Sequence, residues 1–298
     1  MRIMVTGGAG FLGSHVVSEL LRAGHEVVIF DSGDATGVCA RNASIICGNV
    51  LDLPQLMAAS QGIDAICHLA GVGDVYLAAS EPATAAAVNV VGTTNVAEAA
   101  RRNGVGRVVY ASTWEVYGEP EHQPVRETHP CAPDHPYNIT KYAGELMALA
   151  ADRLQEVPAV ALRLGTAYGL GMRPNSVFSR FIAMARSGEP ITIQGTGLQS
   201  RQFTHARDIA RGFRLAVEST VRGCAINLVA EENITIRQLA EMVVARYPTA
   251  IRYGEARAGD VHPALIDSSL AWELFGWKGD VCFRDGLAEL LDEATVAA

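Results

Sequence analysis

The 298-residue sequence has no excess of basic residues, since 24 Lys and Arg stand against 32 Asp and Glu and the net charge is −8. A broad basic surface for nucleic acid is therefore not expected, although a local cationic pocket for phosphate groups is compatible with this charge. No stretch approaches the roughly 18 apolar residues of a membrane-spanning helix, and "MRIMVTGGAGF" lacks the apolar core of a signal peptide. We therefore expect a cytoplasmic protein that binds neither nucleic acid nor membrane.

The sequence also lacks the spacings typical of metal centres and disulfide frameworks. Its six cysteines include no C-x-x-C pair, so they are expected to be reduced and mostly buried thiols. Its eight histidines form no cluster with the spacing of metal ligands. Repeats and low-complexity segments are absent as well. We therefore predict no metal site.

Short apolar runs alternate with amphipathic segments along the first half of the chain. The apolar runs are 2–7, 26–31, 43–50, 65–71, 107–113 and 159–164. Near-continuous apolar strands that alternate with helices indicate a parallel sheet covered by helices on both faces. Hydrophobic residues make up 49% of the chain, which is enough for one large core or two closely packed domains.

After Leu164 the pattern is interrupted by glycine and proline in "GLGMRPN", "SGEP" and "GTGLQSRQF". We predict an α/β fold with a Rossmann-type, doubly wound parallel sheet over residues 1–165. A smaller mixed α/β substrate domain is expected over residues 166–298, with part of roughly 200–230 packing back on the first domain.

Three glycines follow the first predicted strand and open the first predicted helix, in "VTGGAGFLGSH". Gly7, Gly10 and Gly13 would provide a tight turn, close approach to a pyrophosphate and close packing of helix on strand. Asp31 ends the second predicted strand, where a carboxylate binds the adenosine ribose and repels a 2′-phosphate. The pattern favours NAD over NADP; in the alternative, the glycines only form a turn and Asp31 is a solvated strand end.

The segment "YNITK" places Tyr137 and Lys141 four residues apart, on one face of a predicted helix. An ammonium near a phenol lowers the pKa of the phenol. Such a tyrosine can take a proton from a sugar hydroxyl while a hydride leaves the same carbon. By itself the pattern also fits an exposed aromatic residue and a solvated lysine, and its position after the glycine loop favours the chemical interpretation.

With these motifs the sequence resembles the extended short-chain dehydrogenase/reductase superfamily, and within it the nucleotide-sugar epimerases and dehydratases. The resemblance covers nearly the whole chain and rests on "TGGAGFLGSH", "HLAG", "NVVGTTN", "STWEVYG", "YNITK", "GTGLQSRQFTHARD" and "RAGDV". It implies a bound NAD that is reduced and reoxidised in each turnover, a nucleotide-diphosphate sugar that is oxidised at C4, and usually a dimer.

The resemblance also implies roles for individual residues. Thr113 would hydrogen-bond the reacting hydroxyl, Tyr137 would be the base, and Lys141 would hold the nicotinamide ribose. The implied cofactor-binding residues are Gly7, Gly10, Phe11, Leu12, Gly13, Asp31, Asn49, Val50, Leu69, Ala70 and Gly71, together with Tyr137 and Lys141. The implied substrate-binding residues are Arg201 and Arg257, which would bind the diphosphate, and Asp260, near the ribose of the nucleotide. The alternative for each arginine is a surface ion pair.

Two positions depart from the pattern of this family. Asn49 stands where an Asp usually reads the adenine edge, although its carbonyl can still accept a hydrogen bond from the adenine amino group. Thr166 in "RLGTAYG" stands where an Asn usually contacts the sugar phosphate. Because threonine has a shorter reach, the pose of the substrate at Thr166 is open.

The segment "STWEVYG" leaves the reaction type open. The sequence resembles "STDEVYG" of 4,6-dehydratases, in which the acidic pair removes the C5 proton and protonates the leaving hydroxyl. Here Glu115 is kept, whereas Trp114 cannot act as an acid. We predict 4-epimerisation of a nucleoside-diphosphate hexose, most simply a UDP-sugar, with Trp114 as a wall or stacking platform for the sugar. The alternatives are a dehydratase or decarboxylase that uses Glu115, and a non-catalytic NAD-binding sensor or scaffold.

A homodimer is predicted from two helices with more apolar residues than one sheet-facing stripe requires. The apolar positions of the first helix, after "ASEP", are Val88, Val91, Val96 and Ala99. Those of the second, after "DHP", are Tyr142, Leu146, Leu149 and Leu154. The alternative is that both helices are buried within the monomer.

Overall fold

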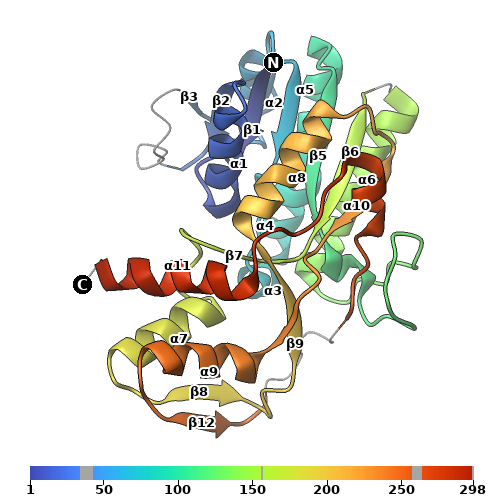
Figure 1. Cartoon of the computed structure of the whole chain (residues 1–298). Helices are drawn as coiled ribbons and strands as arrows, with labels where there is room; N and C mark the ends of the chain where they lie inside the picture. Colours follow the sequence, from blue (N-terminus) through green and yellow to red (C-terminus); the bar gives the residue numbers. More distant parts are fainter. Residues whose placement is uncertain (34–42, 156, 257–263, 297–298) are drawn as a thin grey trace.

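The computed structural model describes residues 1–33, 43–155, 157–256 and 264–296. Its centre is one sheet of seven parallel strands, shown in Figure 1. The strands are β1 (Arg2–Thr6), β2 (Glu26–Asp31), β3 (Ala43–Cys47), β4 (Ala65–His68), β5 (Arg107–Thr113), β6 (Ala159–Leu164) and β10 (Cys224–Leu228). Their order is β10-β6-β5-β4-β1-β2-β3, so the chain winds outward from β1 in both directions. This confirms the predicted doubly wound sheet.

Helices cover both faces of the sheet, because nearly every strand position is apolar. One face carries α1 (Phe11–Arg22), α8 (Ala206–Glu218) and α10 (Ser269–Phe275). The other carries α2 (Leu53–Ala59), α5 (Gly92–Asn103) and α6 (Pro136–Gln155). The short α3 (Val75–Ser80), α4 (Pro82–Ala86) and the π-helical turn η1 (Ala87–Val91) also pack on α6.

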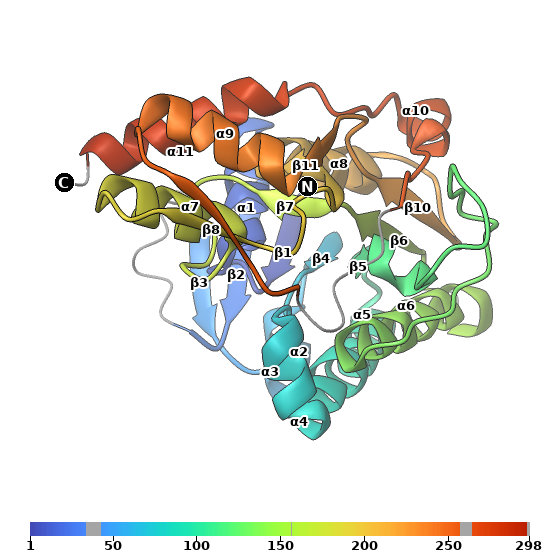
Figure 2. The same ribbon diagram turned by 90° about the horizontal axis from the view of Figure 1, so that it is seen from below.

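A second lobe gathers below the carboxyl edge of the sheet, as the views in Figures 1 and 2 show. Its strands are β7 (Thr166–Tyr168), β9 (Ser200–His205) and β11 (Asn233–Thr235) in one sheet, and β8 (Ile191–Gln194) and β12 (Ile251–Gly254) in another. Its helices are α7 (Val177–Arg186), α9 (Ile236–Arg246) and α11 (Phe283–Val296). A separate apolar core, including Tyr168, Phe178, Phe203 and Phe283, fills this lobe.

The chain passes between the two lobes several times after β6. Helix α8 packs on α1, and β10 pairs with β6, so residues 206–228 belong spatially to the large sheet. The chain then returns to the second lobe at β11 and α9. We propose to keep residues 1–165 and 166–298 as the two domains, with this segment as the part of the second that crosses back.

Candidate active site

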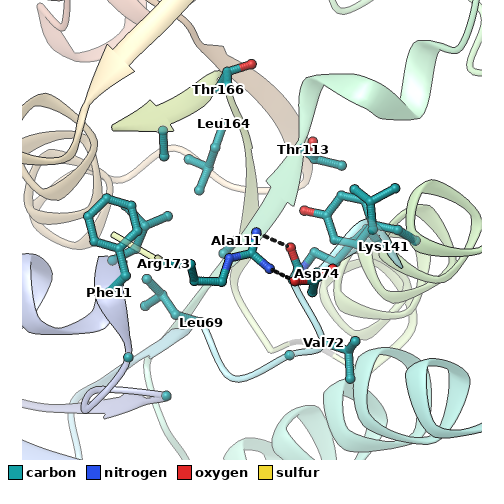
Figure 3. A pocket seen from close by; sticks show the side chains of 18 of the residues that line it. Phe11, Leu69, Val72, Asp74, Ala111, Thr113, Lys141, Leu164, Thr166 and Arg173 are labelled. Atoms are coloured by element: carbon teal, nitrogen blue, oxygen red, sulfur yellow. Dashed lines mark hydrogen bonds and ion pairs between the residues drawn. The ribbon is translucent and has the colours of Figure 1, made fainter. Parts of the chain in front are cut away.

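The carboxyl ends of the central strands border a cavity of about 660 Å³. The predicted residues that line it are Gly7, Gly10, Phe11, Leu12, Gly13, Leu69, Gly71, Thr113, Trp114, Glu115, Tyr137, Lys141 and Thr166. Figure 3 shows Phe11, Leu69, Thr113, Lys141 and Thr166 arranged around this space. The register of the strands places their carboxyl ends at one edge, because Thr6 lies beside His68 in the sheet and Thr113 lies beside Leu164.

The glycine loop is built so tightly that side chains would not fit. Gly7 has a φ of +72°, and a Cβ there would lie 2.6 Å from the Ala70 nitrogen. A Cβ at Gly13 would lie 2.0 Å from the Gly7 carbonyl oxygen. No side chain caps α1 at Gly10, so the N-terminus of this helix faces the cavity with its backbone N–H groups. This arrangement suits a pyrophosphate.

Asp31 holds the same loop from the end of β2. Its Oδ2 accepts a hydrogen bond from Ala9 N at 2.9 Å, and its Oδ1 accepts one from Gly33 N at 2.9 Å. Each carboxylate oxygen has a second lone pair, which a ribose hydroxyl could use. Asp31 therefore positions the loop in addition to the ribose-binding role predicted for it.

A buried histidine joins β1 and β4 to α5 behind the loop. His68 Nδ1 lies 2.7 Å from Thr6 Oγ1, and its Nε2 lies 3.0 Å from Thr93 Oγ1. Since Thr93 Oγ1 donates to the Asn89 carbonyl, it accepts from Nε2–H, and Thr6 donates to Nδ1. Burial, with a contribution from Lys141, lowers the pKa of His68 to about 3. The neutral ring thus fixes the strand ends that carry the cofactor loop.

Asn89 clamps the loop that follows β4. From η1, its Oδ1 accepts from Val72 N at 2.8 Å, while its Nδ2 donates to Thr140 Oγ1 at 3.0 Å on α6. A Cβ at Gly71 would lie 2.8 Å from Asn89 Oδ1, so this close approach requires glycine. The loop is therefore held against the helix that carries Tyr137.

The three proposed catalytic side chains come from two adjacent elements. Thr113 ends β5, where its hydroxyl accepts a hydrogen bond from Glu115 N at 3.3 Å, and it lines the same cavity as Tyr137 on α6. One turn later on α6, Lys141 is buried, with its Nζ 4.4 Å from the centre of the Tyr110 ring. The Tyr110 hydroxyl donates to the Lys141 carbonyl at 3.1 Å, which fixes this turn of helix against β5.

The protein groups alone do not lower the pKa of Tyr137. Burial and the nearby Glu115 raise the pKa of Tyr137, whereas the Thr113 hydroxyl and the charge of Arg173 lower it, and the net direction is upward. Burial also lowers the pKa of Lys141 to about 7, although Glu145 opposes this. The effect of the Lys141 ammonium on Tyr137 in the NAD-bound protein stays a prediction.

Glu115 and Trp114 both line the cavity but differ in surroundings. Burial raises the pKa of Glu115 to about 7, with Arg201 opposing and Asp134 adding to the rise. The carboxyl group can therefore exchange a proton near neutral pH. Trp114 is buried and packs in an apolar cluster with Val229 and Ile266 among others, so it forms part of the wall.

Arg201 lies beside the main cavity in a smaller pocket of about 180 Å³. This pocket also contains Arg180 and Gln199, and it shares Thr166 with the main cavity. Arg201 Nη1 donates to the Ser200 carbonyl at 2.8 Å, and its charge acts on Glu115. The presence of Arg180 in the same pocket supports the diphosphate role predicted for Arg201, which stays a prediction.

Other predicted residues lie elsewhere. Ala70 lies behind the loop, where its N–H reaches Thr6 Oγ1 at 3.4 Å. Asn49 is exposed, with its Oδ1 accepting from Leu51 N, and Val50 is buried against Gly92. Ala70, Asn49 and Val50 are therefore not among the described residues that line the cavity. Arg257 and Asp260 lie outside the described residues.

Sequence reasoning missed a charged pair in the cavity. Arg173 Nη1 lies 2.7 Å from Asp74 Oδ2, and Arg173 Nη2 donates to the Gly73 carbonyl at 3.0 Å. Asn175 Nδ2 also approaches Asp74 Oδ2, at 3.4 Å. The pair lies between the two walls of the cavity in Figure 3. Both residues fall in loops, where no periodicity marks them.

A buried ion pair supports the site from behind and was missed too. Arg163 on β6 pairs with Glu145 on α6 at 2.6 Å, and Ser112 on β5 donates to the same carboxylate at 2.6 Å. Arg163 also donates to the Tyr117 hydroxyl at 2.7 Å. The network joins β5, β6 and α6 and so fixes the relative positions of Thr113 and the α6 residues.

Residues 3–228 match the profile of the NAD dependent epimerase/dehydratase family. The chain belongs to this family. Within it, a dTDP-glucose 4,6-dehydratase of Streptomyces niveus is 30% identical, with 98% of this chain and 92% of that protein covered. The structure of a UDP-glucose 4-epimerase of Thermotoga maritima with UDP-glucose has a TM-score of 0.93 and 29% identity, over 100% of this chain and 99% of the other. MoeE5 with UDP-glucuronic acid and NAD has a TM-score of 0.91 and 32% identity, over 100% of both chains.

The chain is thus an NAD-dependent enzyme of the epimerase/dehydratase family. The cradle of Gly7, Gly10 and Gly13 fits the dinucleotide, because Cβ atoms at Gly7 and Gly13 would clash with backbone atoms and Gly10 is the N-cap of the helix that borders the cavity. In the described part of the chain, no group of three or more His, Cys, Asp or Glu could hold a metal ion. No helix among the described residues is long and apolar enough to cross a membrane.

Proposed function

We propose that the protein is a UDP-hexose 4-epimerase. The observation that carries the proposal is the joint presence of Thr113, Tyr137 and Lys141 in one cavity with the glycine cradle, while Trp114 stands where a dehydratase has its leaving-group acid. The UDP-glucose 4-epimerase of Thermotoga maritima, which has the same fold, supports the choice of substrate class.

Each protein group has a defined task in this reaction. Tyr137 would take the proton of the C4 hydroxyl, and the hydroxyl of Thr113, which lines the same cavity, would orient the reacting oxygen. NAD, when bound, supplies the acceptor for the C4 hydride and its later donor. Lys141 lies beside Gly71 at the base of the cavity, where the nicotinamide ribose would lie. The reaction also requires the 4-keto sugar to turn over before the hydride is returned.

A specific observation favours a second candidate, a 4,6-dehydratase or decarboxylase. Glu115 lines the cavity, and its pKa of about 7 suits a general acid or base. The similarity to the dTDP-glucose 4,6-dehydratase of Streptomyces niveus supports this alternative. Product analysis separates the reactions: we expect UDP-glucose to give a product of unchanged mass. Loss of water would indicate dehydration, and loss of carbon dioxide from UDP-glucuronic acid would indicate decarboxylation.

Replacing Glu115 by Gln tests which reaction uses this side chain. For an epimerase no C5 proton moves and the amide is nearly isosteric, so we expect activity to fall by less than about 10-fold. For a dehydratase the loss should be about 100-fold or more, as for removal of a general base. Steady-state kinetics on purified variants decides between them, and the larger loss would contradict the epimerase assignment.

We further propose a cytoplasmic homodimer that forms through α6. The exposed apolar side chains Ile139, Leu146, Met147 and Leu154 recur on one face of this helix, and Val91 is exposed on the neighbouring η1. The predicted contribution of Val96 and Ala99 is wrong, because both are fully buried in the monomer core. Leu149 is only partly exposed and packs on the core.

Light scattering tests the dimer. The wild-type protein should have twice its chain mass of 31.6 kDa, and Leu146→Glu should convert it to a monomer because a charge would be buried. Trp272→Glu, at an exposed aromatic residue on α10, is the matched control and should stay dimeric. A monomeric wild-type protein at micromolar concentration would contradict the proposal.

A further inference from the structure

Arg173 and Asp74 form an ion pair inside the cavity, although neither is needed for the chemistry described above. Arg173 comes from the segment between β7 and α7, and Asp74 from the loop before α3. Their closest nitrogen and oxygen atoms are 2.7 Å apart. The Arg173 side chain is 53% exposed, so it retains freedom to move when its partner is removed.

The pair lines the same cavity as Thr113 and Tyr137, the residues that would contact the sugar, and we call this part of the cavity the sugar end. The charge of Arg173 lowers the pKa of Tyr137, so the guanidinium is within electrostatic reach of the phenol that would contact the C4 hydroxyl. In a hexose, C6 is joined to C4 through C5 alone. A group on C6 of the bound sugar would therefore lie close to the charges of Arg173 and Asp74.

Asp74 is held in its ionised form. Burial alone would raise its pKa, but hydrogen bonds from Leu77 N–H and Asn175, together with Arg173, lower it below its usual value. The same carboxylate caps α3 by accepting from Tyr76 N and Leu77 N. The charge of Arg173 is thus matched by a fixed negative charge beside it.

We propose that Asp74 cancels the positive charge of Arg173 at the sugar end, so that the site favours a UDP-hexose with an uncharged C6 group over a UDP-hexuronic acid. The inference rests on the proposed function, which it deepens by naming the charge of the preferred sugar. Asp74 is a positioning residue that acts through Arg173. Without Asp74, the guanidinium is free to pair with a C6 carboxylate.

The variant Asp74→Asn removes the charge and keeps the cap, because Asn caps helices about as well as Asp. Asp267→Asn is a close control. Asp267 Oδ2 pairs with the exposed Arg126 at 2.9 Å, and its Oδ1 accepts from Ser269 N at 2.8 Å, away from the cavity. The two substitutions therefore make the same chemical change in similar surroundings.

Calorimetric dissociation constants for UDP-glucose and UDP-glucuronic acid test the proposal. They are measured on the NAD-loaded full chain carrying Tyr137→Phe, so that no sugar is converted. In this background, the preference for UDP-glucose should shift toward UDP-glucuronic acid by about three- to fivefold with Asp74→Asn, the upper part of the range for a partly exposed ion pair. Asp267→Asn should leave the ratio within about twofold of the parent protein, and Arg173→Gln added to Asp74→Asn should abolish the shift.

An unchanged ratio of the two dissociation constants in Asp74→Asn would overturn the inference, and so would a shift that survives the loss of Arg173. In either case, binding of both sugar nucleotides would leave the proposed function intact. A parent protein that already binds UDP-glucuronic acid more tightly would overturn it as well. Failure to bind either sugar nucleotide would instead remove the proposed function, and the inference with it.

Discussion

Tyr137→Phe is expected to lower kcat by at least about 1,000-fold, within the range for loss of a positioned acid–base group. Every reaction considered for this site begins with removal of the C4 hydroxyl proton, and Tyr137 lines the cavity together with Thr113. Phenylalanine keeps the ring and its packing, so the affinity for NAD and for the sugar nucleotide should change little.

Tyr247→Phe is the control for this substitution. It also removes a hydrogen-bonded tyrosine hydroxyl, which donates to the Leu291 carbonyl at 2.7 Å in the second lobe. Its kcat should match that of the wild-type protein. If Tyr137→Phe keeps more than about a tenth of the activity, Tyr137 is not the acid–base residue.

Gly13→Ala should weaken NAD binding by about 10- to 100-fold, because overpacking of about 1–3 kcal/mol falls on the cofactor loop. The new Cβ would lie 2.0 Å from the Gly7 carbonyl oxygen and 2.7 Å from Gly8 Cα. Both are backbone atoms, so the loop itself must move. Titration with NAD by calorimetry measures the change, with circular dichroism to show that the sheet is retained.

Gly104→Ala separates loop geometry from general stability. Gly104 has a φ of +64° at the end of α5, and a Cβ there meets nothing within 4 Å. This substitution should cost about 1 kcal/mol of stability without affecting NAD affinity. Unchanged NAD affinity in Gly13→Ala would show that the loop does not form the cofactor site as proposed.

The parts of the site that follow from local sequence were predictable. The glycine loop is set by a strand, a tight turn and a helix start within a few residues. Tyr137 and Lys141 share a helix face because of their spacing. Apolar runs alternating with helices were enough to predict the sheet, because a sheet covered on both faces requires them.

The parts of the site that depend on contacts between distant segments of the chain were not predictable. Asn175 and Asp74 are 101 residues apart, and only the approach of two loops brings them together. The direction of the pKa shift of Tyr137 depends on burial and on Glu115, which no spacing reveals. Val96 and Ala99 share the apolar character of dimer-forming residues, but the monomer core already buries them.

The most direct test of C4 epimerisation is turnover of UDP-glucose in deuterium oxide, with the position of any deuterium determined by NMR and mass spectrometry. A C4 epimerase removes the hydrogen at C4 as a hydride and returns it within the enzyme, so the UDP-galactose formed should contain no carbon-bound deuterium. Deuterium at C5 would contradict this account and would assign Glu115, with its pKa of about 7, as the base that removes the C5 proton.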